Sequence, residues 1–266
     1  MIHWQIMNDH KKFKRQSIKE ILNQGKNKRF KLITQKWMQE SVKNKYSYHF
    51  EWLGRPIIQY PQDIIAVQNL LWKIKPDLVI ETGIARGGSL IFISSILELI
   101  AQCGESKKSK VVGIDIDIRK HNKIAIKKHP MSKRIITIEG SSTDEKIFRK
   151  VRSISKRFKK IMLFLDSNHA HEHVLKELKL YAPLVSKKSY CIVFDTIINY
   201  LPNKFHLNKP WNKKHNPKTA VNNYLRYLKS KKPRDYKNNL IKFENNKNIE
   251  NQLLITVAPG GFLIRR

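Results

Sequence analysis

Cysteine and long apolar segments are the scarcest features of this 266-residue chain. Its two cysteines, Cys103 and Cys191, lack metal-type spacing, which argues against a disulfide framework or a cysteine zinc site and is typical of a reducing compartment. The longest apolar run, residues 90–101, is too short for a bilayer, and the polar, basic start lacks the apolar core of a secretory signal. We therefore expect a cytoplasmic protein without a transmembrane segment.

Acidic residues are also few, with 21 Asp and Glu against 53 Lys and Arg and a formal net charge of +32. Such a charge is typical of proteins that meet a nucleic acid, an anionic membrane surface or an anionic substrate. The lysines, however, are spread along the whole chain among many Asn and Ile residues, and no aromatic-interleaved basic block accompanies them. A compositional bias would give the same charge, so we expect no specific nucleic-acid partner.

The chain divides by composition into a basic helical N-terminal extension, residues 1–45, and one domain, residues 46–266. The extension is weakly amphipathic and predicts two helices separated by the polar residues 23–27. Such an extension packs on the main domain or on a second subunit, and we expect a homo-oligomer. Residues 46–63 are aromatic and bracketed by prolines, as in a pocket cover or a packed linker, and Asp63 is expected to cap the next helix.

Residues 78–90 have the pattern of a strand, a glycine-rich turn and a helix, the first unit of a nucleotide-type α/β fold. The strand carries Glu81 near its end, and Ser89 with the free N–H groups of the helix start offers hydrogen-bond donors. Three glycines permit positive φ and the close approach of a ligand: Gly83, Gly87 and Gly88. Their spacing differs from the dinucleotide fingerprint Gly-x-Gly-x-x-Gly, which argues against NAD.

A second buried strand, residues 111–115, ends in Asp115. An acid at this place can grip the two hydroxyls of a ribose, or it can cap the following helix. Two such carboxylates, Glu81 and Asp115, on either side of one glycine-rich loop are the pattern of class I S-adenosylmethionine (SAM) methyltransferases. In that arrangement Glu81 and the loop hold the methionine end of SAM, and Asp115 holds its ribose.

Further strands are predicted at residues 134–138, 160–165 and 190–194, each separated from the next by a helical segment. The tail, residues 253–264, predicts a strand, a Pro-Gly turn and an edge strand. This alternation predicts an α/β fold with a doubly wound, mostly parallel sheet of about seven strands, a Rossmann-like methyltransferase fold with a helical N-terminal extension.

Asp166 and Asp195 each follow an apolar strand, which places both at the carboxyl edge of the sheet beside the glycine-rich loop. Two carboxylates there can hold a hard divalent ion such as Mg²⁺. An ion so placed lowers the pKa of a bound hydroxyl and orients it. His169, three residues after Asp166, is close enough to act as the base that removes the hydroxyl proton.

His169, His171 and His173 alternate at the start of a predicted helix, a spacing that suggests zinc at first sight. On a helix His169 and His173 share a face and His171 points elsewhere, which disfavours a shared zinc ion. His169 is then a base or a metal ligand, or an ordinary helix-start histidine like the others. Ser142, in a small-residue turn after the third strand, can hydrogen-bond an adenine or cap the next helix.

Taken together, these blocks resemble the cephalosporin hydroxylase family over roughly residues 45–265. The matching segments lie at residues 52–58, 81–90, 113–119, 139–144, 165–174, 194–196, 210–211 and 216–220. Members of this family resemble class I SAM methyltransferases of the Mg²⁺-dependent catechol O-methyltransferase type and include sugar and natural-product O-methyltransferases.

The resemblance implies a SAM site, a metal site and a catalytic pair. SAM is implied at Glu81, Gly83, Ala85, Gly87, Gly88, Ser89, Asp115 and Ser142, the metal at Asp166 and Asp195, and catalysis at His169 with Asp166. The catechol type has a second acid or amide beside the fifth-strand aspartate, where this chain has Phe194 and Thr196. The metal is therefore held more weakly, or its shell is completed by Thr196 or His169.

The sequence thus predicts a SAM-dependent, Mg²⁺-assisted O-methyltransferase that acts on a hydroxyl of a sugar, glycan or natural-product small molecule. Two alternatives stay open. The hydroxylase role in the family name is disfavoured because no iron-binding triad of two histidines and one carboxylate is evident. The chain could also be a non-catalytic SAM-binding subunit.

Overall fold

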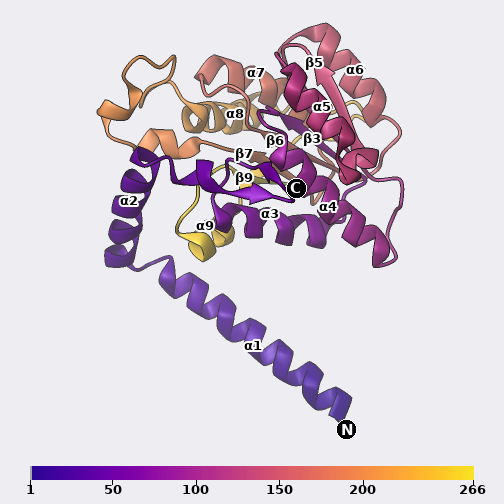
Figure 1. The fold of residues 1–266 in the computed structure, drawn as a ribbon. Coiled ribbons are helices and arrows are strands. Elements are labelled where there is room, and N and C mark those ends of the chain that lie inside the picture. The colour runs from indigo at the N-terminus through magenta and orange to yellow at the C-terminus, as the bar shows by residue number, and fades with distance from the viewer. Residues whose placement is uncertain (1) are drawn as a thin grey trace.

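The computed structural model describes residues 2–266, with side chains from residue 9 onward. The chain begins with two helices, α1 (Ile2–Gln24) and α2 (Lys28–Lys43), which confirms the two-helix prediction. α1 projects away from the body of the molecule (Figure 1). Its last turn lies against α9 (Lys247–Leu253), where Nε2 of Gln24 donates to the carbonyl oxygen of Asn251 at 2.7 Å.

A seven-stranded sheet forms the centre of the molecule. Its strands are β3 (Leu78–Thr82), β4 (Lys110–Asp115), β5 (Ile135–Glu139), β6 (Ile161–Leu165), β7 (Tyr190–Val193), β8 (Phe243–Asn245) and β9 (Phe262–Arg265). They lie in the order β5-β4-β3-β6-β7-β9-β8, with β3 to β7 parallel and β9 antiparallel to both of its neighbours. The predicted doubly wound, mostly parallel sheet is confirmed.

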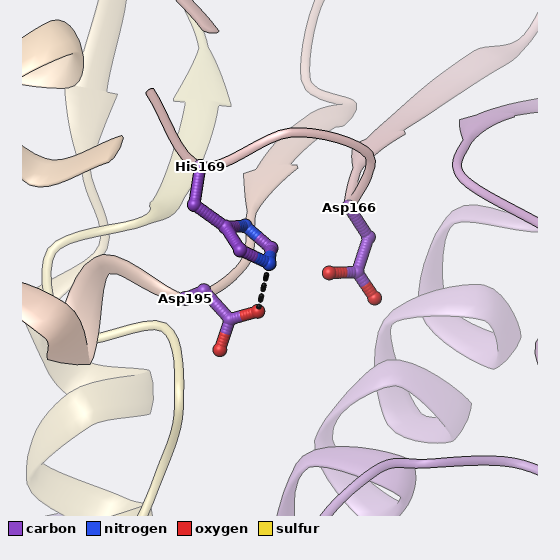
Figure 2. A group of neighbouring side chains, drawn as sticks. All are labelled: Asp166, His169 and Asp195. Atoms are coloured by element: carbon purple, nitrogen blue, oxygen red, sulfur yellow. Dashed lines mark ion pairs between the residues drawn. The ribbon is translucent and has the colours of Figure 1, made fainter. Parts of the chain in front are cut away.

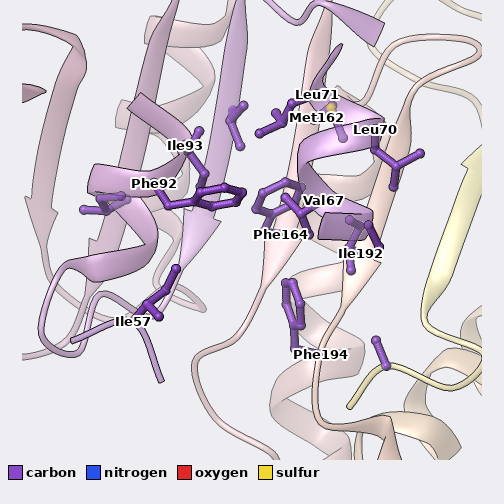
Figure 3. Packing of buried hydrophobic residues seen from close by; sticks show 14 of the residues in the cluster. Ile57, Val67, Leu70, Leu71, Phe92, Ile93, Met162, Phe164, Ile192 and Phe194 are labelled. Carbon is purple, nitrogen blue, oxygen red and sulfur yellow. The ribbon is translucent and has the colours of Figure 1, made fainter. Parts of the chain in front are cut away.

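Helices cover both faces of this sheet. The main ones are α3 (Pro61–Ile74), α4 (Gly88–Gln102), α5 (Lys120–Lys128), α6 (Glu145–Ser155), α7 (His171–Tyr181) and α8 (Pro217–Lys231). Because successive strand residues point to opposite faces, each strand contributes to two separate cores. Met162 and Phe164 of β6 pack with α3 and α4 on one face (Figure 3), whereas Leu163 packs with α7 and α8 on the other.

The predicted terminal hairpin is wrong. Residues 247–253 are helical, no strand forms between residue 254 and residue 261, and β9 lies inside the sheet with β8 as the edge strand. The apolar run that suggested a strand is buried in another way: Leu253, Ile255 and Val257 pack in the core beside α3. A short apolar run fits a strand or a buried loop equally well, and here α3 supplies the cover.

Asp63 does not cap a helix as predicted. α3 begins two residues earlier, with Pro61 as its first residue, and Asp63 lies buried in its first turn. Its carboxylate accepts hydrogen bonds from the hydroxyl of Thr256 and, at 2.9 Å, from the backbone N–H of Val257. Burial raises the pKa of Asp63 to about 7. This acid therefore ties α3 to the segment before β9.

Residues 46–56 fold over the start of α4. They form a short 3-10 helix (Tyr46–His49) and a small hairpin of β1 (Glu51–Trp52) and β2 (Arg55–Pro56). The indole N–H of Trp52 donates to the hydroxyl of Ser95 at 2.9 Å, which fastens the hairpin to α4.

Among residues 2–266, no helix combines the length and the hydrophobicity needed to cross a bilayer. This agrees with the expected absence of a transmembrane segment. The cytoplasmic location, the homo-oligomer and the division of the chain after residue 45 stay predictions.

Candidate functional site

Three polar side chains converge beyond the carboxyl ends of β6 and β7. Asp166 follows β6, Asp195 lies two residues after β7, and His169 lies in the loop between β6 and α7. One ligand atom from each lies within 4.8 Å of those of the other two (Figure 2). Nε2 of His169 is 3.3 Å from Oδ2 of Asp195. The predicted convergence of these residues is confirmed, because parallel strands deliver their carboxyl ends to one edge of the sheet.

The pKa of Asp166 is shifted by its surroundings in this cluster. Nε2 of Gln59 donates to its Oδ2 at 2.9 Å. Burial, followed by the nearby carboxylates of Asp195 and Glu81, raises the pKa of Asp166 well above its usual range. The two carboxylates of this cluster supply the oxygen ligands that a hard divalent cation prefers, and such a cation would relieve the repulsion between the acids.

Thr196 does not complete the metal site. It is buried, and its hydroxyl donates to the carbonyl oxygen of Pro259 at 2.9 Å. Phe194, on the other side of Asp195, packs in the core against Phe164. Of the two completing groups considered from the sequence, only His169 faces the aspartates.

A cavity of about 440 Å³ opens in front of the cluster. Its walls come from residues 42–60 on one side and from the long insertion around residues 197–211 on the other. Of the two interpretations of the aromatic segment at residues 46–63, the structure therefore favours the pocket cover. Trp211, from the insertion, contacts the ring of His169 edge to face, with ring centroids 4.9 Å apart. No motif or spacing in the sequence indicates this contact.

The glycine-rich loop is shaped by close contacts within the protein. Gly83 has φ +91°, and a Cβ atom there would lie 2.1 Å from the carbonyl oxygen of Asp166. Gly87 has φ +83° and faces Ile126. Gly88, in contrast to the prediction, has no positive φ; a Cβ there would lie 2.2 Å from the carbonyl oxygen of Pro56. Loop and walls are thus fitted to each other before any ligand binds.

Glu81 is buried below this loop with only part of its hydrogen-bonding capacity used. Its Oε1 accepts from the hydroxyl of Ser89, whereas its Oε2 has no hydrogen-bond partner in the described part of the chain. Burial raises the pKa of Glu81 to about 8. A buried carboxylate with a free oxygen suits a cationic group, and Glu81 and Ser89 both line the cavity in front of the cluster.

Asp115 holds the loop rather than the next helix. Its Oδ2 accepts from the backbone N–H groups of Ile84 at 2.8 Å and Ala85 at 3.2 Å. α5 has Arg119, not Asp115, at its N-terminal cap, so the helix-cap alternative is wrong. Asp115 also lines a second cavity, of about 320 Å³, together with Ala85 and Ser142.

The two cavities adjoin. Gly83, Ala85, Asp166 and Ser167 line both of them, so the second cavity meets the first beside the metal-type cluster. Of the other predicted SAM residues, Gly88 and Ser89 line the first cavity. Gly87 lines neither cavity.

Ser142 belongs to a polar network that sequence reasoning missed. Its hydroxyl lies 3.0 Å from Nε2 of His173, and this nitrogen is 3.4 Å from Oε1 of the fully buried Glu177. Ser167 donates to the same carboxylate at 2.7 Å. The helix-cap alternative for Ser142 is wrong, because Asp144 caps α6. The four-residue spacing of His173 and Glu177 on one helix face was the available signal.

His171 points away from the cluster, as expected, but it is not a free surface group. Its ring is buried, with Nδ1 2.7 Å from the hydroxyl of Thr219, and it joins α7 to α8. The three alternating histidines thus have separate partners, in agreement with the expectation that they share no zinc ion.

Comparisons with known proteins show the family of this chain. The family model described as rhamnosyl O-methyltransferase/CmcI matches residues 44–266, which confirms the family resemblance predicted from the motifs. A rhamnosyl O-methyltransferase of Mycobacterium bovis (strain BCG / Pasteur 1173P2) is 31% identical over 207 residues, covering 76% of this chain and 73% of that protein. Its counterpart in Mycobacterium leprae (strain TN) is 29% identical over 216 residues, with coverages of 81% and 82%.

Solved structures show the same fold at lower identity. An apo structure of CmcI has a TM-score of 0.54 and 18% identity, covering 82% of this chain and 76% of that one. A CmcI structure described as Mg-SAM has a TM-score of 0.53 and 16% identity, with coverages of 82% and 77%. These matches support the Rossmann-like methyltransferase fold.

Proposed function

Because the chain belongs to the rhamnosyl O-methyltransferase/CmcI family, we propose that it transfers a methyl group from SAM to a sugar hydroxyl with the assistance of Mg²⁺. The predicted enzyme class, an O-methyltransferase, is confirmed by this membership. We place the catalytic domain in residues 46–266, with residues 1–45 as an extension. The observation that carries the proposal is the cluster of Asp166, His169 and Asp195 where two cavities meet.

The SAM site in this proposal is the smaller cavity, the loop beside it and the part of the larger cavity that Glu81 and Ser89 line. Asp115, already fixed by the loop N–H groups, faces the ribose, and Ser142 lies at the adenine side. Glu81, once ionised, accepts a hydrogen bond from the ammonium group through its free Oε2, because a buried carboxylate without a counter-charge is stabilised by pairing with a cation. Support for SAM also comes from the CmcI structure described as Mg-SAM.

Asp166 and Asp195 would hold the metal, and His169 accepts the proton of the acceptor hydroxyl. When bound, SAM supplies an electrophilic methyl group and Mg²⁺ supplies a positive charge that acidifies the acceptor hydroxyl. Nε2 of His169 accepts the hydroxyl proton, and Oδ2 of Asp195, 3.3 Å away, stabilises the imidazolium that results. Gln59 keeps the carboxylate of Asp166 turned toward the cavity through its 2.9 Å hydrogen bond.

The rest of the larger cavity receives the acceptor. A sugar is favoured because the curated relatives are named rhamnosyl O-methyltransferases. The hydroxylase alternative is not favoured by the cluster, because it offers one histidine and two carboxylates, whereas the iron triad of oxygenases uses two histidines and one carboxylate.

The test is methyl transfer by the purified protein. We expect transfer of a labelled methyl group from SAM to one or more rhamnosides in the presence of Mg²⁺, detected by mass spectrometry, and loss of activity with EDTA. Asp166→Asn should lower turnover by roughly 10²-fold or more while SAM still binds, whereas Asp117→Asn, at an exposed carboxylate outside the cluster, should act like the unchanged protein.

The variant His169→Ala distinguishes two roles of His169, the general base and a metal ligand. If His169 is the base, His169→Ala should lower turnover by roughly 10²–10⁴-fold and leave the affinity for Mg²⁺ little changed. A large loss of Mg²⁺ affinity would make it a ligand instead. If the protein binds SAM but methylates no sugar, and if Asp166→Asn leaves SAM binding unchanged, the alternative of a non-catalytic SAM-binding subunit is favoured.

A further inference from the structure

The N-terminal helices expose several apolar side chains. Six side chains on α1 and α2 are between 42% and 67% exposed: Phe13, Ile18, Leu22, Phe30, Leu32 and Ile33. The second half of α2 is packed on the domain, since Met38 is buried in the core and Trp37 contacts Tyr46 and Tyr60. The exposed apolar residues of α2 lie in its first two turns, ahead of this packed half.

α1 leaves most of its length without support from the domain. It extends away from the body of the molecule and meets it at the α9 end (Figure 1). A single helix in water is only marginally stable, because most helical stability in proteins comes from packing of an apolar face. In this 23-residue helix the exposed Ile18 and Leu22 are one turn apart and share a side, which fits a surface that covers that side. Phe13 is exposed on the other side.

The charge of this region selects the kind of surface. Residues 1–45 carry twelve Lys and Arg against three acidic residues. A second copy of the same helix would bring like charges together, and a nucleic acid would match the charge but leave the apolar side chains uncovered. A bilayer containing anionic lipids matches both, since Lys and Arg meet the headgroups while apolar side chains enter the boundary with the acyl chains.

We propose that α1 and the first two turns of α2 dock on an anionic membrane surface, lying in its plane. No helix among residues 2–266 is suited to cross the bilayer, so the contact is peripheral. α2 leads directly to the larger cavity, because Val42 near its end and Lys45 just after it line that cavity. Docking would therefore hold one wall of the candidate active site beside the membrane. The proposal does not depend on the acceptor being a sugar.

Co-sedimentation of the full chain with lipid vesicles tests this. We expect binding to phosphatidylcholine vesicles containing about 30% phosphatidylglycerol, little binding to phosphatidylcholine alone, and release by about 0.5 M salt. Ile18→Asp should weaken the binding by ~10-fold or more. Leu99→Asp is the matched control, because Leu99 on α4 is 59% exposed, like Ile18 at 56%, yet lies on another helix, and its binding should be unchanged.

Each contrary result has a definite meaning. Equal binding to both kinds of vesicle, or unchanged binding of Ile18→Asp with helix content preserved by circular dichroism, would overturn the proposal. If vesicles are not bound and sedimentation velocity shows an oligomer that Ile18→Asp dissociates, a second copy covers this face. If duplex DNA is bound at physiological salt in place of vesicles, the partner is a nucleic acid.

Discussion

Glu81 and Asp166 are acids that the fold makes costly to ionise. Glu81 is buried below the glycine-rich loop with one oxygen free, and Asp166 shares its cavity with Asp195. Burial is the largest cause of the raised pKa of both groups. A cation beside either carboxylate would favour its charged form, so the resting site is prepared for positively charged ligands.

The raised pKa of Glu81 predicts that SAM binding depends on pH. In the free protein this pKa is about 8, so the carboxyl is protonated at pH 6 and must release its proton to pair with the ligand's ammonium group. Between about pH 5.5 and 7 the affinity should therefore rise with pH, by up to ~10-fold per unit. Calorimetry in two buffers of different ionisation enthalpy measures both the affinity and the released proton.

Glu81→Gln is the control for this dependence, because it removes the titrating group and keeps the shape. Its SAM affinity should be lower at neutral pH and nearly flat over the same range. A wild-type affinity that does not change with pH, at constant Mg²⁺, would remove Glu81 from the cation-binding role.

At the scale of elements, the β1–β2 hairpin and the start of α4 are fitted to each other through Gly88. The carbonyl oxygen of Pro56 lies 2.2 Å from the place that a Cβ atom at this position would take. The chain then continues from Pro56 to Gln59, whose amide holds Asp166. A helix start, a hairpin and a metal-type cluster are therefore linked by one close backbone contact.

Gly88→Ala should disturb both stability and turnover. The added Cβ must displace the backbone of Pro56, which we expect to cost roughly 1–3 kcal/mol of unfolding free energy, as overpacking usually does, and to lower methyl transfer. Chemical denaturation and a turnover assay measure the two effects.

Gly104→Ala, just beyond the other end of α4, is the comparison. Gly104 has φ +92° with no atom near its Cβ position, so this change should cost about 1 kcal/mol through the backbone alone and leave turnover intact. Equal losses of turnover in both variants would contradict the link between hairpin and cluster.

The whole molecule carries a net charge of +32, spread over its length rather than gathered in one nucleic-acid motif. The many Lys and Arg side chains repel one another in the folded protein, and together they attract any polyanion weakly. The apolar residues of α1 and α2 set this region apart from the rest of the basic surface, because they add a contact that salt does not screen.

Binding to DNA should therefore be weak and easily removed by salt. We expect fluorescence anisotropy to show retention of duplex DNA at low ionic strength, with a steep log–log dependence on salt, and no binding at about 0.15 M. Tight binding at that salt, or preference for one sequence, would overturn the view that the charge is compositional.

The sequence by itself determined the strands that build the sheet and the edge at which its acids meet. Glu81, Asp115, Asp166 and Asp195 each lie at or near the carboxyl end of a buried apolar strand. Parallel strands point these ends in one direction, so local pattern alone was enough to bring the residues together. The same local reasoning found the two N-terminal helices, and it offered a pocket cover as one of two interpretations of residues 46–63.

Only the tertiary structure decided which partners the remaining polar residues take. Asp63 meets Thr256, His171 meets Thr219 and Trp211 meets His169 across long stretches of sequence. The apolar tail segment before residue 258 is buried beside α3 and needs no strand partner. Such contacts depend on how packed elements face each other, and the periodicity of one segment carries no information about the surface opposite it.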